Sequence, residues 1–310
     1  MADVAAITTS APGSLMLLGE HAVLHGHRSL VCAINRRITV RLFPLEEDAV
    51  RITSELGSYE SPLSDLMDHP ALRFVIQAIR QHADQLPSGL ELKIDSEFSP
   101  DIGFGSSAAV TVAIHAAILA CLLGEAPENE LLFKEALQTV QTVQGRGSGA
   151  DLAASVFGGI VAYTTEPTFQ PVAVSMPLTA VYCGYKTPTP EVILKVEQLR
   201  ADHPQQYERI FSEMGAGAAN AIGCLIKHDL LGFGTILNHN QQLMDKMGVN
   251  TPELQEIVEA LQAAPDVFGA KISGSGLGDC AVGIGVADLN DLDYPVHHLE
   301  VSPTGCDYHE

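Results

Sequence analysis

A turn rich in glycine and serine runs directly into a long apolar segment, and this junction constrains the fold more than any other feature of the chain. The turn spans residues 103–109 (Gly-Phe-Gly-Ser-Ser-Ala-Ala), and the apolar segment continues from Ala108 to Leu123. Glycines let a backbone close around an anion, and the free N–H groups and dipole of a helix start attract phosphate. The Ser107 hydroxyl can approach a metal ion carried by the phosphates. We therefore predict a phosphate-binding loop, with a simple helix cap made by Ser106 or Ser107 as the alternative.

Because the chain is strongly acidic overall, a phosphate-binding site must be built from local groups. The 310 residues carry a net charge of −21, whereas nucleic acids and anionic membranes bind clustered Lys and Arg. We therefore expect a small-molecule ligand and neither a nucleic-acid nor a membrane partner. No Lys follows Gly105, so the loop does not match the G-x-x-x-x-G-K-[ST] phosphate motif. The nucleotide fold must be of another kind.

The N-terminus and the longest apolar segment indicate a cytoplasmic protein. The first residues, Met-Ala-Asp-Val, lack the basic start and apolar core of a secretory signal. The segment from Ala108 to Leu123 includes Thr111 and His115 and is shorter than the ~18 apolar residues of a membrane span. We expect it to be a buried core helix.

The order of the remaining patterns predicts an α+β protein with two lobes. Alternating or continuous apolar runs predict strands at residues 4–9, 36–43, 90–94 and 160–164. Helical periodicity with glycine or proline stops predicts helices at 70–82, 130–144, 190–200, 205–227, 230–247 and 252–263. Prolines separate short runs between residues 168 and 187, so we place the lobes at 1–170 and 171–310. A homodimer stays open, because apolar helix faces look the same in a core and in an interface.

Three further segments carry groups suited to a catalytic site. Glu20 and His21 follow an apolar run and so lie at a strand end, where polar residues usually face a site; alone, His21 would be a satisfied half-buried histidine. Asp151 follows a glycine-rich turn and could accept the proton of a hydroxyl during phosphoryl transfer, or equally cap a helix. The run from Ser273 to Asp279 could approach a ligand closely or be an ordinary tight turn.

The segments at residues 11–26, 103–109, 145–153 and 271–280, in this order, resemble the signature motifs of the GHMP kinases, the family of galactokinase, homoserine kinase, mevalonate kinase and phosphomevalonate kinase. The resemblance implies a two-lobe α+β fold, with an N-terminal lobe like ribosomal protein S5 domain 2 and a C-terminal ferredoxin-like lobe. It also implies an ATP-dependent phosphotransferase that uses Mg²⁺ and acts on the hydroxyl of a small acid bound between the lobes.

The same resemblance assigns roles to individual residues. Asp151 is the implied catalytic carboxylate, and Ser107 is the implied magnesium ligand. The implied substrate-binding residues are Glu20, His21, Ala22, Val23 and Ser148. The implied nucleotide-binding residues are Pro100, Asp101, Ile102, Gly103, Phe104, Gly105, Ser106, Ser107, Ala108, Ala109, Ser273, Gly274 and Gly276.

Within the family, the run Gly19–Val23 followed by Gly26 is most similar to the mevalonate kinases, which act in isoprenoid precursor synthesis. It lacks the Thr-Asp continuation of the galactokinases. The surroundings of Asp151 and the run Gly278–Cys280 are more similar to the phosphomevalonate kinases, and Arg146 is available for a phosphorylated acceptor.

Two positions depart from the mevalonate kinase pattern. Ser14 stands where a Lys usually pairs with the catalytic Asp, which leaves Arg28, Arg146 or Lys186 to substitute. Val140 and Gln141 stand where a magnesium-binding Glu is usual. These departures support a further alternative, a non-catalytic sensor that binds nucleotide or metabolite without turnover.

Overall fold

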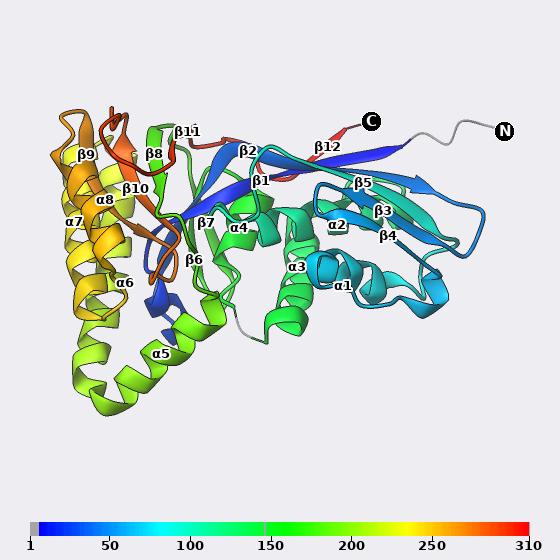
Figure 1. Ribbon diagram of the computed structural model, residues 1–310, viewed down its shortest axis with the longest axis horizontal. Helices are drawn as coiled ribbons and strands as arrows, with labels where there is room; N and C mark the ends of the chain where they lie inside the picture. Colours follow the sequence, from blue (N-terminus) through cyan, green and yellow to red (C-terminus); the bar gives the residue numbers. More distant parts are fainter. Residues whose placement is uncertain (1–5, 146, 310) are drawn as a thin grey trace.

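The computed structural model describes residues 6–145 and 147–309, which form two lobes built on separate sheets (Figure 1). Within these residues the first sheet has eight strands, in the order β12-β1-β2-β5-β3-β4, with β6 against β2 and β7 against β6. Its strands are β1 (Ile7–Leu18), β2 (Ser29–Pro44), β3 (Val50–Ser54), β4 (Gly57–Ser61), β5 (Leu90–Ser96), β6 (Ile160–Thr164), β7 (Thr168–Val172) and β12 (Asp307–His309). The pairing of β3 with β5 is parallel, and the others are antiparallel.

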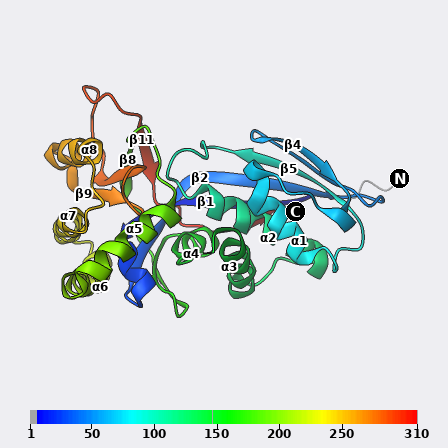
Figure 2. The same ribbon diagram turned by 60° about the horizontal axis from the view of Figure 1, so that its bottom comes forward.

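Four helices cover one face of this sheet (Figure 2). They are α1 (Arg73–His82), α2 (Ser106–Leu123), α3 (Asn129–Gln144) and α4 (Ala150–Phe157). Helices α2 and α4 pack on β1 and β2, whereas α1 and α3 pack against α2. Helix α2 has 18 residues, so it is long and apolar enough to cross a membrane and the shorter length expected from the sequence is wrong, but 67% of it is buried inside the lobe. It is therefore a core helix, as its sequence predicts.

The second sheet is antiparallel, in the order β11-β8-β10-β9. Its strands are β8 (Pro177–Tyr182), β9 (Val267–Ser273), β10 (Cys280–Gly285) and β11 (Val296–Glu300), and its helices are α5 (Thr189–Asp202), α6 (Pro204–Ile226), α7 (Leu230–Lys246) and α8 (Pro252–Ala263). Helix α7 covers the free edge of β9. Asn238 Oδ1 accepts a hydrogen bond from Ala270 N, and Gln241 Oε1 accepts one from Ile272 N, both at 2.9 Å. This edge is therefore closed to pairing with another strand.

The predicted elements agree with the structure in kind and differ at several ends. The strand predicted at residues 4–9, of which residues 4 and 5 lie outside the described part, extends to Leu18, with irregular pairing on β2 around Pro12–Ser14. The helix predicted from Pro70 begins as a 3-10 turn, and α1 starts at Arg73. Strand β12 returns to the first sheet beside β1. The lobe boundary at residue 170 stays a prediction.

Candidate active site

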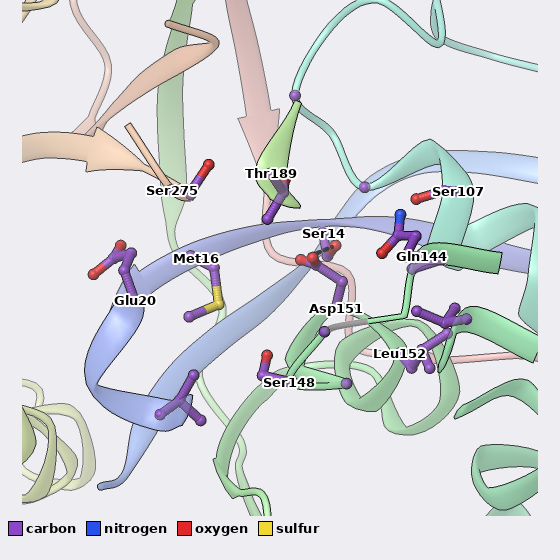
Figure 3. A pocket seen from close by; sticks show the side chains of 18 of the residues that line it. Ser14, Met16, Glu20, Ser107, Gln144, Ser148, Asp151, Leu152, Thr189 and Ser275 are labelled. Atoms are coloured by element: carbon purple, nitrogen blue, oxygen red, sulfur yellow. Dashed lines mark hydrogen bonds between the residues drawn. The ribbon is translucent and has the colours of Figure 1, made fainter. Parts of the chain in front are cut away.

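A cavity of about 180 Å³ lies where the ends of several elements meet (Figure 3). Strand β1 contributes Ser14 and Met16, and the segment after it contributes Glu20 and His21. The other walls come from the starts of α2 and α4, from the segment before α5, and from the loop between β9 and β10. The cavity thus gathers all four motifs that the sequence singles out.

The predicted phosphate loop is fixed on strand β1. Ser14 N donates a hydrogen bond of 2.9 Å to the carbonyl oxygen of Phe104. Gly105 has φ +66°, and a Cβ atom there would lie 2.1 Å from Ser14 Oγ, so this position requires glycine. Helix α2 begins directly after it, with Gly105 as N-cap and no capping hydrogen bond from a side chain. Ser106 and Ser107 are therefore the first helical residues, and the helix-cap alternative is wrong.

Asp151 is the second residue of α4 and faces the cavity. The N-cap of α4 is Gly149, so the alternative role of Asp151 as a cap is also wrong. Ser14 Oγ donates a hydrogen bond of 2.8 Å to Asp151 Oδ1, and the two side chains face each other in Figure 3. Burial raises the pKa of Asp151, while the Ser14 hydrogen bond and the charge of Lys186 act in the opposite direction. A carboxylate with a raised pKa in a cavity is a candidate general base.

His21 lines the cavity and is held through one of its ring nitrogens. Its Nε2 lies 2.8 Å from the carbonyl oxygen of Ser275, and because a carbonyl can only accept, Nε2 carries the hydrogen. Burial lowers the pKa of His21, so the ring is neutral and Nδ1 is left as an acceptor. The same bond joins the segment after β1 to the loop between β9 and β10.

Glu20 is held by groups of the second lobe. Its carboxylate forms a buried ion pair with Lys271 Nζ in β9 and accepts a hydrogen bond of 3.2 Å from Asn240 Nδ2 in α7. Lys271 Nζ also donates to the carbonyl oxygen of Ile272. In Figure 3 the Glu20 carboxylate is directed away from Asp151. The structure thus shows Glu20 joining the lobes, and its contact with substrate stays a prediction.

A second, larger cavity of about 890 Å³ adjoins the first. The residues common to the two linings are Ser106, Ser107, Gln144, Lys186 and Thr189. Apolar side chains on the far side include Leu72, Phe74, Val75, Ile94, Val110 and Val143. The start of α2 therefore lies at the junction between a polar cavity and a partly apolar one.

The structure brings most of the predicted site residues together around the first cavity and leaves the others outside its lining. The predicted residues that line the first cavity are Glu20, His21, Val23, Gly103, Gly105, Ser106, Ser107, Ala108, Ser148, Asp151, Ser273 and Gly274. Pro100 lines the second cavity. The predicted residues that line neither are Ala22, Asp101, Ile102, Phe104, Ala109 and Gly276. Of these, Ala22, Phe104 and Ala109 are buried in the core.

Sequence reasoning gave no role to several residues that line the first cavity. Met16 and Asp279 lie within the segments 11–26 and 271–280 but have no predicted role of their own, whereas Gln144 and Thr189 lie outside all four segments. Of the three cations considered as substitutes, Lys186 lines both cavities and Arg28 lines neither. Arg146 lies outside the described residues. The proline-rich segment around Lys186 offers no pattern that would have placed it here.

The oxygen atoms around the loop fit a magnesium ion only in part. Ser107 and Asp151 supply oxygen donors, the type that Mg²⁺ prefers, and Val140 occupies the wall where the family resemblance leads us to expect a further carboxylate. Among the described residues no group of three His, Cys, Asp or Glu side chains is arranged to hold a metal. The protein would therefore hold Mg²⁺ together with the phosphates of a nucleotide.

Comparison with known sequences gives a consistent picture. The family model for the N-terminal domain of GHMP kinases matches residues 71–159, and the model for their C-terminal domain matches residues 221–292. A galactokinase galactose-binding signature matches residues 2–42. The mevalonate kinase of Archaeoglobus fulgidus is 35% identical over 279 residues, which cover 89% of this chain and 91% of that protein. The mevalonate kinase of Thermococcus gammatolerans is 31% identical, covering 88% and 87%.

Solved structures share the same fold. The mevalonate kinase of Methanococcus jannaschii superposes with a TM-score of 0.80 at 22% identity, covering 96% of this chain and 99% of that one. The L. major mevalonate kinase in complex with R-mevalonate gives 0.78 at 23% identity, covering 96% of both chains. The galactose complex of Lactococcus lactis galactokinase gives 0.82 at 18%, covering 98% and 95%. These likenesses confirm the predicted two-lobe α+β fold.

Proposed function

Because the chain belongs to the GHMP kinase family, and so is an ATP-dependent phosphotransferase that acts on an alcohol, we propose that it phosphorylates the 5-hydroxyl of mevalonate in isoprenoid precursor synthesis. The observation that carries this choice of acceptor is the similarity, over nearly the whole chain, to several mevalonate kinases. The cytoplasmic location expected from the sequence is part of the proposal.

The two adjoining cavities suit the two substrates. The nucleoside of ATP occupies the larger cavity, whose volume of about 890 Å³ and partly apolar walls are typical of a small-molecule site. The phosphates lie at the junction, where the backbone N–H groups at the start of α2 point toward them. The acceptor occupies the smaller cavity beside Asp151.

The transfer step uses the Asp151 carboxylate as a base or orienting group. Asp151 accepts the proton of the acceptor hydroxyl, whose oxygen forms a bond to the γ-phosphorus while the bond to the β–γ bridging oxygen breaks and ADP leaves. Ser14 keeps the carboxylate pointed at the cavity, and His21 Nδ1 accepts from a second hydroxyl of the acceptor. Ser107 would hold a magnesium ion together with the nucleotide, and that ion would supply positive charge to neutralise the phosphates.

A phosphorylated acceptor is the first alternative, and the charge of the small cavity weighs against it. Among the described residues, Lys186 is the one Lys or Arg in its lining, whereas Glu20, Asp151 and Asp279 supply three carboxylates. Phosphomevalonate brings a second phosphate, which would require additional cations. Arg146, which lies outside the described residues, is the group that this alternative needs.

A sugar acceptor is the second alternative, and a specific observation favours it. The galactose-binding signature covers residues 2–42, and this stretch includes Ser14, Glu20 and His21. Mevalonate and galactose both present several hydroxyls to such a surface. The negative charge of mevalonate distinguishes them, because it needs a cation or backbone donors and galactose does not.

The test is ADP release with Mg-ATP and, separately, mevalonate, phosphomevalonate or galactose, with Asp151→Asn as a control. We expect turnover with mevalonate that is abolished in the control. Turnover with phosphomevalonate or galactose alone would replace the acceptor and leave the phosphotransfer intact. Nucleotide binding without turnover on any acceptor would support the sensor alternative.

A further inference from the structure

Lys186 occupies a position that few charged residues of this chain share. It lies between β8 and α5 and lines both cavities at their junction. The smaller cavity contains no other Lys or Arg from the described part of the chain, and the side chain that reaches Asp151 from β1 is the uncharged Ser14. Among the described residues of the smaller cavity, a triphosphate in this place therefore meets carboxylates, the N–H groups of α2 and the ammonium group of Lys186.

Asp279 holds this ammonium group in place. Lys186 Nζ lies 3.3 Å from Asp279 Oδ2. The two segments are also joined through their backbones, because Asp279 N donates to the carbonyl oxygen of Tyr185 at 2.8 Å and Cys183 N donates to that of Asp279 at 2.9 Å. The position of Lys186 thus depends on the loop between β9 and β10.

The backbone around Asp279 is strained, and the phosphate loop is fitted to it. Asp279 has φ +76°, in the left-handed region that glycine favours. Its carboxylate takes the space that a Cβ atom on Gly103 would need, at 2.0 Å from Oδ1. Oδ1 is buried and has no hydrogen-bond partner within the described residues. Strained residues of this kind persist where a surrounding site requires them.

A purely structural ion pair does not explain this arrangement. The side chains of Lys186 and Asp279 are 38% and 19% exposed, and partly exposed pairs add little to stability. We infer that Lys186, positioned by Asp279 at the junction of the two cavities, is the catalytic cation that stabilises the charge of the transferred phosphoryl group. The inference rests on the placement of ATP in the proposed function, but it does not depend on which acceptor is used.

Steady-state kinetics of four single variants and one double variant test this role. Removal of one preorganised donor to a charged transition state typically lowers kcat by about 100-fold to 1,000-fold, which we expect for Lys186→Met, with a smaller loss for Lys186→Arg. Asp279→Asn should lower kcat by roughly 10-fold and have no added effect once Lys186 is Met, since it acts through that side chain. Lys195→Met, on the exposed face of α5, is the matched control and should leave kcat unchanged.

Nucleotide binding gives a readout that does not need an acceptor. Calorimetry should show that Lys186→Met loses the preference for a non-hydrolysable ATP analogue over ADP, while its affinity for ADP changes by less than about threefold. Retention of that preference, an equal loss for both nucleotides, or an unchanged kcat would overturn the inference. If the wild type turns over none of the three acceptors, the proposed acceptor is wrong and the binding comparison alone decides. Should Lys186→Met fail to fold, Lys186→Gln, which also removes the charge, is measured in the same way.

Discussion

Ser14 Oγ donates a hydrogen bond of 2.8 Å to Asp151 Oδ1, across 137 positions of sequence. The bond joins β1, which also carries the phosphate loop through the contact between Ser14 N and Phe104, to the start of α4. A neutral hydroxyl therefore orients the carboxylate at a position where the family resemblance leads us to expect a lysine. The charge that a lysine would bring must come from elsewhere in the cavity.

The pH dependence of the reaction should report this hydrogen bond. The Ser14 donor stabilises the ionised form of Asp151 and lowers its pKa, against the larger effect of burial, which raises it. In Ser14→Ala the pKa of Asp151 therefore rises further. A base is active when ionised, so its activity is lost as pH falls through its pKa, and the acid limb of kcat/KM should move to higher pH. Ser58→Ala, on the exposed part of β4, is the control, and an unmoved acid limb in Ser14→Ala would disprove the role.

Gly105→Ala should disable the phosphate loop. The new methyl group would lie 2.1 Å from Ser14 Oγ, and φ +66° strains any other residue, so either the loop or Ser14 must move. We expect the Kd for ATP to rise by roughly 10-fold or more, which corresponds to a loss of at least ~1.4 kcal/mol of binding free energy. Gly223→Ala in α6, where a Cβ atom meets open space, is the control. Equal ATP affinity in wild type and Gly105→Ala, measured by calorimetry, would contradict the loop's role.

Removing one charge of the buried pair of Glu20 and Lys271 should destabilise the protein more than removing both. Lys271 is fully buried, burial lowers its pKa, and the attraction of Glu20 acts in the opposite direction. Lys271→Met leaves a buried carboxylate unpaired and should lower the free energy of unfolding by about 3–5 kcal/mol. The double variant with Glu20→Gln should recover most of this loss.

Urea denaturation measures both effects, with Lys93→Met as the control, since Lys93 forms a partly exposed pair with Glu91 at 3.4 Å. That control should change stability by less than about 1 kcal/mol. A Lys271→Met protein as stable as the wild type would show that the ion pair does not stabilise the junction of the lobes.

Acid should destabilise the first lobe through a buried histidine. His115 in α2 lies 3.1 Å from His82 and 2.8 Å from Thr139, and burial, with a smaller effect of His82, lowers its pKa to about 3. The unfolded chain binds a proton near the ordinary value of 6.5, whereas the folded chain does not until about 3. Stability is therefore lost as pH falls below 6.5, by about 2 kcal/mol between pH 7 and pH 5.

The midpoints of urea denaturation at pH 7 and pH 5 test whether stability falls with pH. His115→Gln should flatten the pH dependence, whereas His298→Gln, at an exposed position of β11, should leave it unchanged. An equally steep loss in His115→Gln would assign the acid sensitivity to other groups.

Local patterns in the sequence predict the elements well because their physical causes are local. Helix α8 begins at Pro252, as its proline and periodicity indicate, and β6 spans Ile160–Thr164 as predicted. Strand β1 is the main exception, because Pro12 and Gly13 read as a break. The strand continues through them with irregular pairing on β2, and Gly13 lies against Phe104, where a Cβ atom would come within 2.5 Å of its carbonyl oxygen. That contact is made across 91 positions and has no local signature.

The candidate site likewise combines residues with a local sequence signal and residues whose place depends on tertiary contacts. The glycine-rich loops and the segment around Asp151 have local sequence patterns that indicate a binding site. The structure places Ser107 and Asp151 in the lining of one cavity. Lys271 gave no such signal, because a lysine in a strand is expected to be exposed, and its burial depends on Glu20 from the other lobe. The sequence offers Arg28, Arg146 and Lys186 equally as the cation, and tertiary contacts alone distinguish Lys186 from Arg28.

The most direct test of the central claim is phosphorus NMR of the products from Mg-ATP and R-mevalonate, with wild type and Asp151→Asn side by side and Asp95→Asn as an exposed carboxylate control. We expect a new phosphomonoester on the 5-oxygen of mevalonate, formed with one ADP per ester by the wild type and the control. Asp151→Asn should form it at least about 1,000-fold more slowly while it still binds nucleotide. Release of inorganic phosphate without an ester, or an undiminished rate in Asp151→Asn, would contradict the account.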